Sequence, residues 1–160
     1  MKRVLSPRPL TLSAVAGLLF LVSVPRVHQL AVHDNQRDAM SAVLLLVPPV
    51  FNDADLGATP PSNESLSQEL GHRLNDVRYD PRSRLIRRHG YFLDVGLTHD
   101  RHGIIRAWPE RHGRTGVSAF VYDRSRGLLS NPNASAAWSG AGSIRPDGTE
   151  AGWQPVSPRR

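Results

Sequence analysis

Short apolar segments separated by glycine-containing turns constrain the fold of this chain more than any other feature. The connecting turns are only a few residues long, which is too short for the crossover that parallel strands require. Consecutive segments must therefore run antiparallel, and the sequence predicts a small antiparallel sheet of three to four strands. The strand candidates are residues 91–97, 104–108 and 117–122, with Leu128 and Leu129 beginning a possible fourth.

The N-terminus predicts an export signal or a membrane anchor. Residues 10–24 are fifteen consecutive positions without a charge, and the basic residues Lys2, Arg3 and Arg8 precede them. The length fits a signal-peptide core and is short of the about 20 apolar residues that span a bilayer. The residues that follow, up to His28, lack the small residues that signal peptidase prefers, which favours an uncleaved signal anchor over residues 1–25. The basic residues would stay in the cytoplasm and place the C-terminal domain outside a cell inner membrane, crossed once.

Apolar residues at helical spacing continue beyond this anchor. They predict a helix over residues 26–47, which Pro48 and Pro49 are expected to end. Ser62 begins an N-cap pattern for a second, short helix over residues 63–74. The expected fold class is α+β, with an N-terminal hydrophobic helix followed by a small antiparallel β-sheet in a domain over residues 48–130.

Composition limits the size of the hydrophobic core and the kinds of partner that the chain can bind. An apolar fraction of 39% in 160 residues supports one modest core. Residues 131–160 are rich in Gly, Pro and Ser, with Trp138 and Trp153 as isolated large apolar residues, which predicts a flexible tail. The net charge of +6 favours anionic surfaces such as a membrane, but the arginines are scattered rather than gathered on one helix face, which disfavours nucleic acid.

The most basic segment is the exception to this scatter. Five arginines lie within residues 78–88, and Tyr79 and Tyr91 flank the densest part, residues 82–88. Two aromatic residues are fewer than the interleaved pattern of a single-strand binder. We interpret the segment as a solvated connector, with a contact to lipid headgroups or nucleic acid as the alternative.

Candidate catalytic and metal-binding residues form no recognisable site. His99 and His102, with Asp100 between them and Asp94 nearby, offer at most two ligands from one hairpin, whereas zinc requires three or four. No nucleophile elbow, dinucleotide fingerprint or P-loop pattern occurs, and the chain has no cysteine. The sequence therefore predicts no enzymatic activity, no metal and no cofactor.

The segment between the second and third strand candidates has the chemistry of a shaped turn. Pro109 can end a strand, Gly113 and Gly116 can adopt positive φ, and Thr115 can bond locally to the backbone. We expect a structural role for it rather than a ligand-binding one, because no reactive residue accompanies it. Further along the chain, Phe120 lies on one face of its strand and both faces are expected to be partly covered.

These residues carry a resemblance to a known family. Gly90-Tyr91-Phe92, then Ala107-Trp108-Pro109 and Gly113-Arg114-Thr115-Gly116, then Phe120 and Asp123, resemble the C-terminal half of type IV pilin-like proteins of some environmental bacteria, including minor pilins and pseudopilins. The likeness covers about a quarter of the chain, with His112 where a tyrosine is usual and one residue inserted between Asp123 and Gly127. Pro9, Leu10 and Ala14 stand where pilins have their processing-site glycine, phenylalanine and glutamate. The motif residues are Gly90, Tyr91, Phe92, Ala107, Pro109, Gly113, Thr115, Gly116, Phe120, Asp123 and Gly127.

The resemblance implies a membrane-anchored, extracytoplasmic structural or assembly protein without catalytic activity. Its implied partners are the membrane and homologous pilin-like subunits or secretion and assembly machinery. A secreted bacterial family of unknown function shares a similar strand-turn-strand motif and an ending like Gly152-Trp153-Gln154-Pro155-Val156. The alternative is therefore a secreted, periplasmic or cell-envelope binding domain of unknown ligand.

Overall fold

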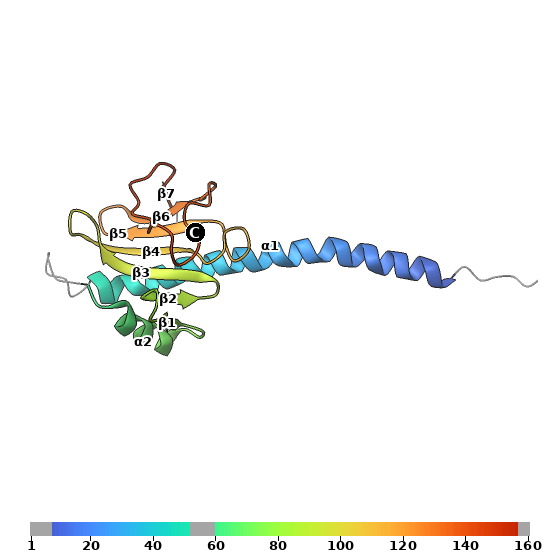
Figure 1. The fold of residues 1–160 in the computed structure, drawn as a ribbon, viewed down its shortest axis with the longest axis horizontal. Helices are drawn as coiled ribbons and strands as arrows, with labels where there is room; N and C mark the ends of the chain where they lie inside the picture. Colours follow the sequence, from blue (N-terminus) through green and yellow to red (C-terminus); the bar gives the residue numbers. More distant parts are fainter. Residues whose placement is uncertain (1–7, 52–59, 157–160) are drawn as a thin grey trace, which may run out of the picture. The chain divides into compact units, whose positions relative to one another are not determined.

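The computed structural model describes the backbone of residues 8–51 and 60–156, and the side chains of these ranges from residue 26 onward. The elements are two helices and seven strands (Figure 1). They are α1 (Arg8–Phe51), α2 (Asn63–Arg73), β1 (Arg78–Asp80), β2 (Leu85–Arg88), β3 (Tyr91–Leu97), β4 (Gly103–Pro109), β5 (Ala119–Asp123), β6 (Gly127–Asn131) and β7 (Gln154–Pro155). The chain divides into two compact units, residues 1–31 and residues 32–160.

The first helix is longer than the sequence predicts. It covers residues 26–47 and continues through Pro48 and Pro49 to Phe51, so the prediction that the two prolines end it was wrong by one turn. The side chains of Val50 and Phe51 are buried at 4% and 9% exposure. Burying such side chains contributes about 1.5–3 kcal/mol each, which opposes the about 3 kcal/mol that each of the two helical prolines costs.

The predicted anchor over residues 1–25 lies outside the side chains that the structure describes, and only its helical backbone from Arg8 is seen. Within the described part of the chain, no helix has a stretch that is long and apolar enough for a bilayer crossing.

The strands form one antiparallel sheet in the order β1-β2-β3-β4-β5-β6-β7, which confirms the α+β class and the antiparallel topology (Figure 1). The predicted count of three to four strands was wrong, because the sheet has seven. The predicted strands became β3, β4 and β5, and the possible fourth became β6. The strands that the sequence did not reveal are β1, β2 and β7, which have two to four residues each. So few residues give no alternating pattern of apolar positions.

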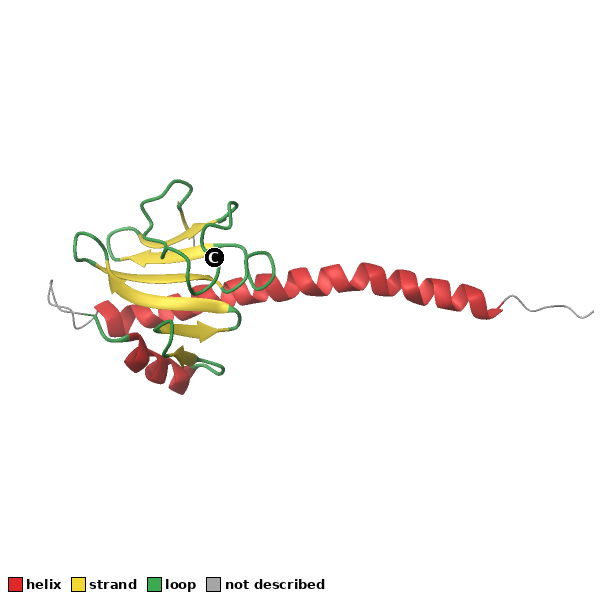
Figure 2. Ribbon diagram, viewed as in Figure 1, coloured by secondary structure: helices red, strands yellow, loops and turns green. Residues whose placement is uncertain are grey.

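One face of the sheet is covered by the helices, as Figure 2 shows for the second half of α1. Most α1 residues in this core are three or four positions apart, which places them on one side of the helix. They are Ala39, Ala42, Val43, Leu46, Val50 and Phe51, and they pack with Ile86, Tyr91, Leu93, Val95, Ile105, Ala107 and Phe120 of the strands and Leu66 and Leu70 of α2.

The opposite face is covered by the C-terminal segment. Trp138 is buried at 7% exposure against Phe92 and Trp108, and the Trp153 ring lies 5.3 Å from the Trp138 ring. The segment predicted as a flexible tail therefore supplies core residues and the edge strand β7 as far as residue 156. Its composition resembles that of a linker, and only the two tryptophans gave a signal of packing. Both faces of the sheet are thus covered, as expected.

The start of α2 connects this helix to the sheet edge. Ser62 caps α2 by accepting a hydrogen bond from the Ser65 amide, which confirms the predicted cap. The Asn63 side chain accepts from the Val95 amide at 2.9 Å and donates to Asp94 Oδ1 at 2.8 Å. The pairing of β2 with β3 ends at Leu93, so β2 offers no acceptor for the Val95 amide. The Asn63 side chain supplies that acceptor instead.

Candidate functional site

The structure brings most of the motif residues together at one end of the sheet and leaves two at the other. Gly90 precedes β3, Tyr91 and Phe92 begin it, Ala107 and Pro109 lie at the end of β4, and Phe120 lies near the start of β5. Gly113, Thr115 and Gly116 lie between β4 and β5, in residues 110–118, which we call the motif loop. Asp123 and Gly127 lie at the opposite end of β5, where β6 begins.

The motif loop fits against the start of β3 because two glycines lack side chains. A Cβ atom on Gly90, whose φ is +75°, would lie 2.5 Å from the Thr115 Cβ. A Cβ atom on Gly116 would lie less than 3.0 Å from the Tyr91 ring and its hydroxyl oxygen. Gly113 has a φ of +73°, as predicted, whereas Gly116 is not at positive φ, so that part of the prediction was wrong. Gly116 is required for space rather than for backbone conformation.

Hydrogen bonds hold the loop in this shape. The Tyr91 hydroxyl donates to the Ser118 carbonyl at 3.0 Å, and burial raises the pKa of this hydroxyl. The Thr115 hydroxyl oxygen accepts from the Arg111 amide at 3.0 Å, which confirms the predicted local bond. The Glu110 amide donates to the Gly90 carbonyl at 2.8 Å. These hydrogen bonds join the start of β3 to the motif loop, and they pair the polar groups of Gly90, Tyr91 and Thr115 with atoms of the loop itself.

Helix α1 contacts the motif loop through polar side chains. Asn35 Nδ2 donates to the Thr115 carbonyl at 2.9 Å, and Gln36 Nε2 donates to Ser118 Oγ at 3.3 Å. Neither α1 residue was a sequence-based candidate. Polar residues in a helix resemble any solvated face, so no sequence signal distinguished them.

A charged cluster lies beside these contacts. Asp38 of α1 accepts two hydrogen bonds of 2.6 Å from Arg88, which is only 7% exposed, and Arg88 also donates to the Asn75 carbonyl. The ring of His89 lies 2.9 Å from the same carboxylate and 3.5 Å from Asp76. Partial burial acts to raise the pKa of Asp38, but the hydrogen bonds and charge of Arg88, with a smaller effect of His89, hold it below its ordinary value.

The segment 78–88, interpreted as a solvated connector, instead forms β1 and β2. Alternation in β2 turns Ile86 and Arg88 toward the helices, which is why one arginine of this basic segment is buried. Arg87 points to the other face, where it pairs with Glu110 and lies over the Phe92 ring at 5.7 Å.

A shallow cleft opens at the same end of the sheet. Its volume is about 280 Å³, and we call it the end cleft. Its lining is mostly charged and comes from the start of β1, the end of β2, the turn that follows and the motif loop. The lining residues are Asp76, Arg78, Arg87, Arg88, His89, Gly90 and Glu110.

The two distant motif residues form a separate turn. Asp123 accepts from the Ser125 amide at 2.8 Å and from Arg126 Nε at 3.1 Å, and Gly127 has a φ of +75°. Partial burial acts to raise the pKa of Asp123, but these hydrogen bonds outweigh it and lower the value. This turn shapes the β5–β6 hairpin and contributes nothing to the motif loop.

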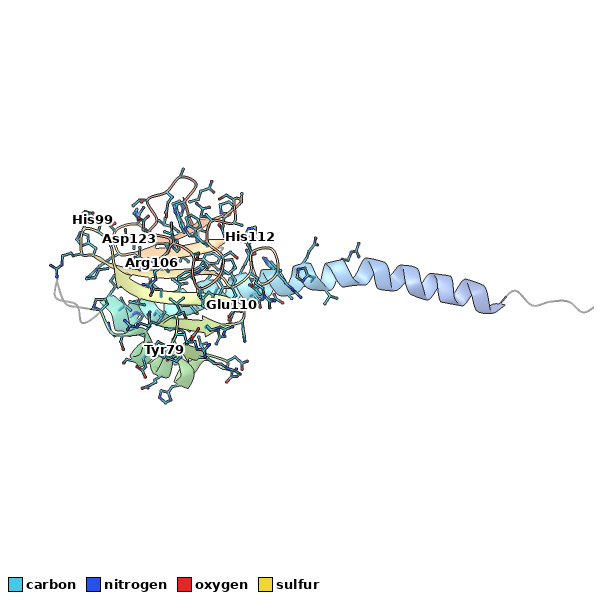
Figure 3. All side chains as sticks on the ribbon, in the orientation of Figure 1. Tyr79, His99, Arg106, Glu110, His112 and Asp123 are labelled. Atoms are coloured by element: carbon cyan, nitrogen blue, oxygen red, sulfur yellow. The ribbon has the colours of Figure 1, made fainter. Side chains whose placement is uncertain are left out.

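The residues weighed as metal ligands do not converge. His99, Asp100 and His102 are exposed and lie in the β3–β4 turn, where Figure 3 labels His99. Asp94 is 1% exposed and pairs with Arg106 Nη1 at 3.0 Å and Arg145 Nη1 at 3.4 Å. Burial lowers the pKa of Arg106, and the Asp94 charge opposes that shift. Among the described residues, no group of three or more His, Cys, Asp or Glu side chains is placed to hold a metal ion.

Comparisons with protein-family models, with curated proteins and with solved structures found no match to this chain.

Proposed function

We propose that this protein is a membrane-anchored, extracytoplasmic structural subunit of the type IV pilin-like kind, which acts by assembly rather than catalysis. The observation that carries this proposal is α1. One helix includes the charge-free run 10–24 and, from Val32 onward, belongs to the same compact unit as the sheet. In this proposal the charge-free run stays in the bilayer or packs against neighbouring subunits.

The polar contacts of α1 with the sheet domain support this proposal. Besides the apolar core, three polar side chains of α1, Asn35, Gln36 and Asp38, form hydrogen bonds with the motif loop and β2. Apolar packing alone has no direction, whereas hydrogen bonds and ion pairs fix the register of one element on another. A subunit that transmits force from an anchor to its domain needs such a fixed register.

A secreted or cell-envelope binding domain is the second candidate. It is favoured by the length of the charge-free run, because fifteen residues match a cleavable signal core better than a bilayer span. The end cleft would then be the place to look for its ligand.

Fractionation of the expressed protein combined with intact-mass measurement separates the two candidates. A full-length species in the membrane fraction supports the anchored subunit. A soluble species that has lost residues 10–24 overturns it and leaves the secreted domain. A double variant Leu18→Arg, Leu19→Arg serves as the control, because two central arginines cost about 5–7 kcal/mol on insertion and should abolish membrane retention.

Assembly is tested by cysteine crosslinking, since the chain has no cysteine of its own. Leu30 is 63% exposed within one copy, so Leu30→Cys should form a disulfide-linked dimer in membranes if neighbouring helices pack together. Asp100→Cys in the exposed β3–β4 turn is the matched control. Equal crosslinking of the two variants would argue against helix-mediated assembly.

A further inference from the structure

The sheet domain has two ends that differ in their contacts with α1. At the first end, which we call the helix-entry end, Asn35 and Asp38 contact the motif loop and β2. The opposite end carries the β1–β2, β3–β4 and β5–β6 turns. The end cleft belongs entirely to the helix-entry end.

Most charges at the helix-entry end are paired with each other. Arg87 pairs with Glu110, Arg88 pairs with Asp38, and His89 lies between Asp38 and Asp76. Several exposed arginines at this end form no ion pair with another described residue. They include Arg78, Arg111 and Arg114, and also Arg37 of α1.

The position of Arg78 indicates that the end cleft lacks a negative charge to compensate it. Arg78 and Arg87 are direct cross-strand partners in the β1–β2 ladder, and both line the end cleft. Like charges directly opposite each other destabilise a sheet. Glu110 compensates Arg87, so an anion in the end cleft would compensate Arg78 in the same way. Guanidinium groups bind phosphate with two parallel hydrogen bonds, and a cleft of about 280 Å³ admits a phosphate group.

The sequence places this end close to the predicted anchor along the chain. Only eleven residues (35 − 24) separate Val24, the last of the charge-free run, from Asn35, which contacts the motif loop. An arginine near an anionic leaflet contributes about 1 kcal/mol of attraction. Exposed arginines at this end of the sheet domain would be attracted to a leaflet that contains anionic lipid.

We propose that the helix-entry end docks on anionic phospholipid, with a headgroup phosphate against Arg78 in the end cleft and Arg111 and Arg114 on neighbouring phosphates. This inference rests on the proposed membrane anchor. It adds a second, electrostatic contact that sets the orientation of the domain on the membrane.

The test uses the full chain in lipid nanodiscs and a single introduced cysteine that carries a fluorophore. Ala134→Cys places the label in an exposed loop at the helix-entry end, and His99→Cys places it in the turn at the opposite end. Nanodiscs contain either phosphatidylcholine alone or about one third phosphatidylglycerol, each with a headgroup-linked quencher, at about 50 mM and about 500 mM salt. Quenching of the Ala134 label should rise with phosphatidylglycerol at low salt only.

Two triple variants that each remove three positive charges, one at each end of the sheet domain, test which arginines bind the lipid. Arg78→Gln, Arg111→Gln, Arg114→Gln should lower the ratio of docked to undocked protein roughly 100-fold and remove the phosphatidylglycerol effect. Arg82→Gln, Arg84→Gln, Arg124→Gln removes the same charge from the opposite end and should leave the effect intact.

The outcomes separate this inference from the proposed function. Equal quenching in both lipids, or equal loss in both triple variants, with the protein still in the discs, overturns the docking and keeps the anchor. A chain that does not enter the discs overturns the anchor and the docking with it. Inorganic phosphate that abolishes the quenching of the Ala134 label, where chloride at the same ionic strength does not, would show competition at the end cleft and support the site.

Discussion

Gly116 is a position where a single added methyl group should strongly destabilise the fold. Its backbone is not at positive φ, so alanine is allowed there conformationally. The added Cβ would nevertheless lie less than 3.0 Å from the Tyr91 Oη, Cζ and Cε2 atoms. Tyr91 is fully buried, and its hydroxyl is held by the Ser118 carbonyl, so the ring cannot move away without losing contacts.

The expected loss of stability has two parts. Overpacking a buried site by one methyl group costs about 1–3 kcal/mol. Displacing the ring breaks the bond to Ser118 and leaves a buried hydroxyl without a partner, which costs about 1–3 kcal/mol more. We therefore expect Gly116→Ala to lower the free energy of unfolding by about 2–6 kcal/mol, a large fraction of the about 5–15 kcal/mol typical of a domain.

Urea unfolding followed by tryptophan fluorescence measures this change, because Trp108 is fully buried. Gly142→Ala is the matched control, since a Cβ at Gly142 meets no atom within 4 Å and its φ is not positive. Gly142→Ala should change stability by no more than about 0.5 kcal/mol. In the double variant Gly116→Ala, Tyr91→Leu, the two costs should be clearly non-additive. A Gly116→Ala protein as stable as the Gly142→Ala control would refute the reasoning.

Further predictions concern buried polar groups. Asp38→Asn should destabilise the fold by about 2–4 kcal/mol at neutral pH, because Arg88 loses its counter-charge. The pKa of Asp38 is lower in the folded state, so its stabilisation is present above about pH 4 and is lost as the pH falls further. The free energy of unfolding of Asp38→Asn should therefore fall less steeply below about pH 4 than that of the unaltered protein. The same pH dependence in both proteins would contradict this. His112→Phe should leave stability unchanged or raise it by about 1 kcal/mol in thermal unfolding, because His112 Nε2 is buried without a partner in the described part of the chain. Asn63→Ala should cost about 2–4 kcal/mol and speed hydrogen exchange at the Val95 amide, whereas removal of the Ser62 cap should cost only about 1 kcal/mol.

Local patterns in the sequence were sufficient for several elements. Alternation of apolar residues between turn residues predicted β3 over residues 91–97, and the Ser62 pattern predicted the start of α2. These signals are local because strand alternation and helix capping depend on residues within a few positions of each other. The turn glycines of the motif loop could also be recognised from neighbouring residues. That Gly116 is needed to leave space for the Tyr91 ring could not be predicted from the sequence.

Packing between residues far apart in the sequence decided where α1 ends, whether the C-terminal segment packs on the sheet and which charged residues pair. The last turn of α1 persists through two prolines because Val50 and Phe51 are buried, and the C-terminal segment is packed because Trp138 fits beside Trp108. The ion pair of Asp38 with Arg88 joins residues fifty positions apart.

The chain by itself therefore determined the α+β class, the antiparallel turns and the charge-free run. Which polar residues meet, where the helix ends and what covers the second face of the sheet were decided only in three dimensions. The physical reason is that burial and pairing depend on neighbours that the sequence places far apart.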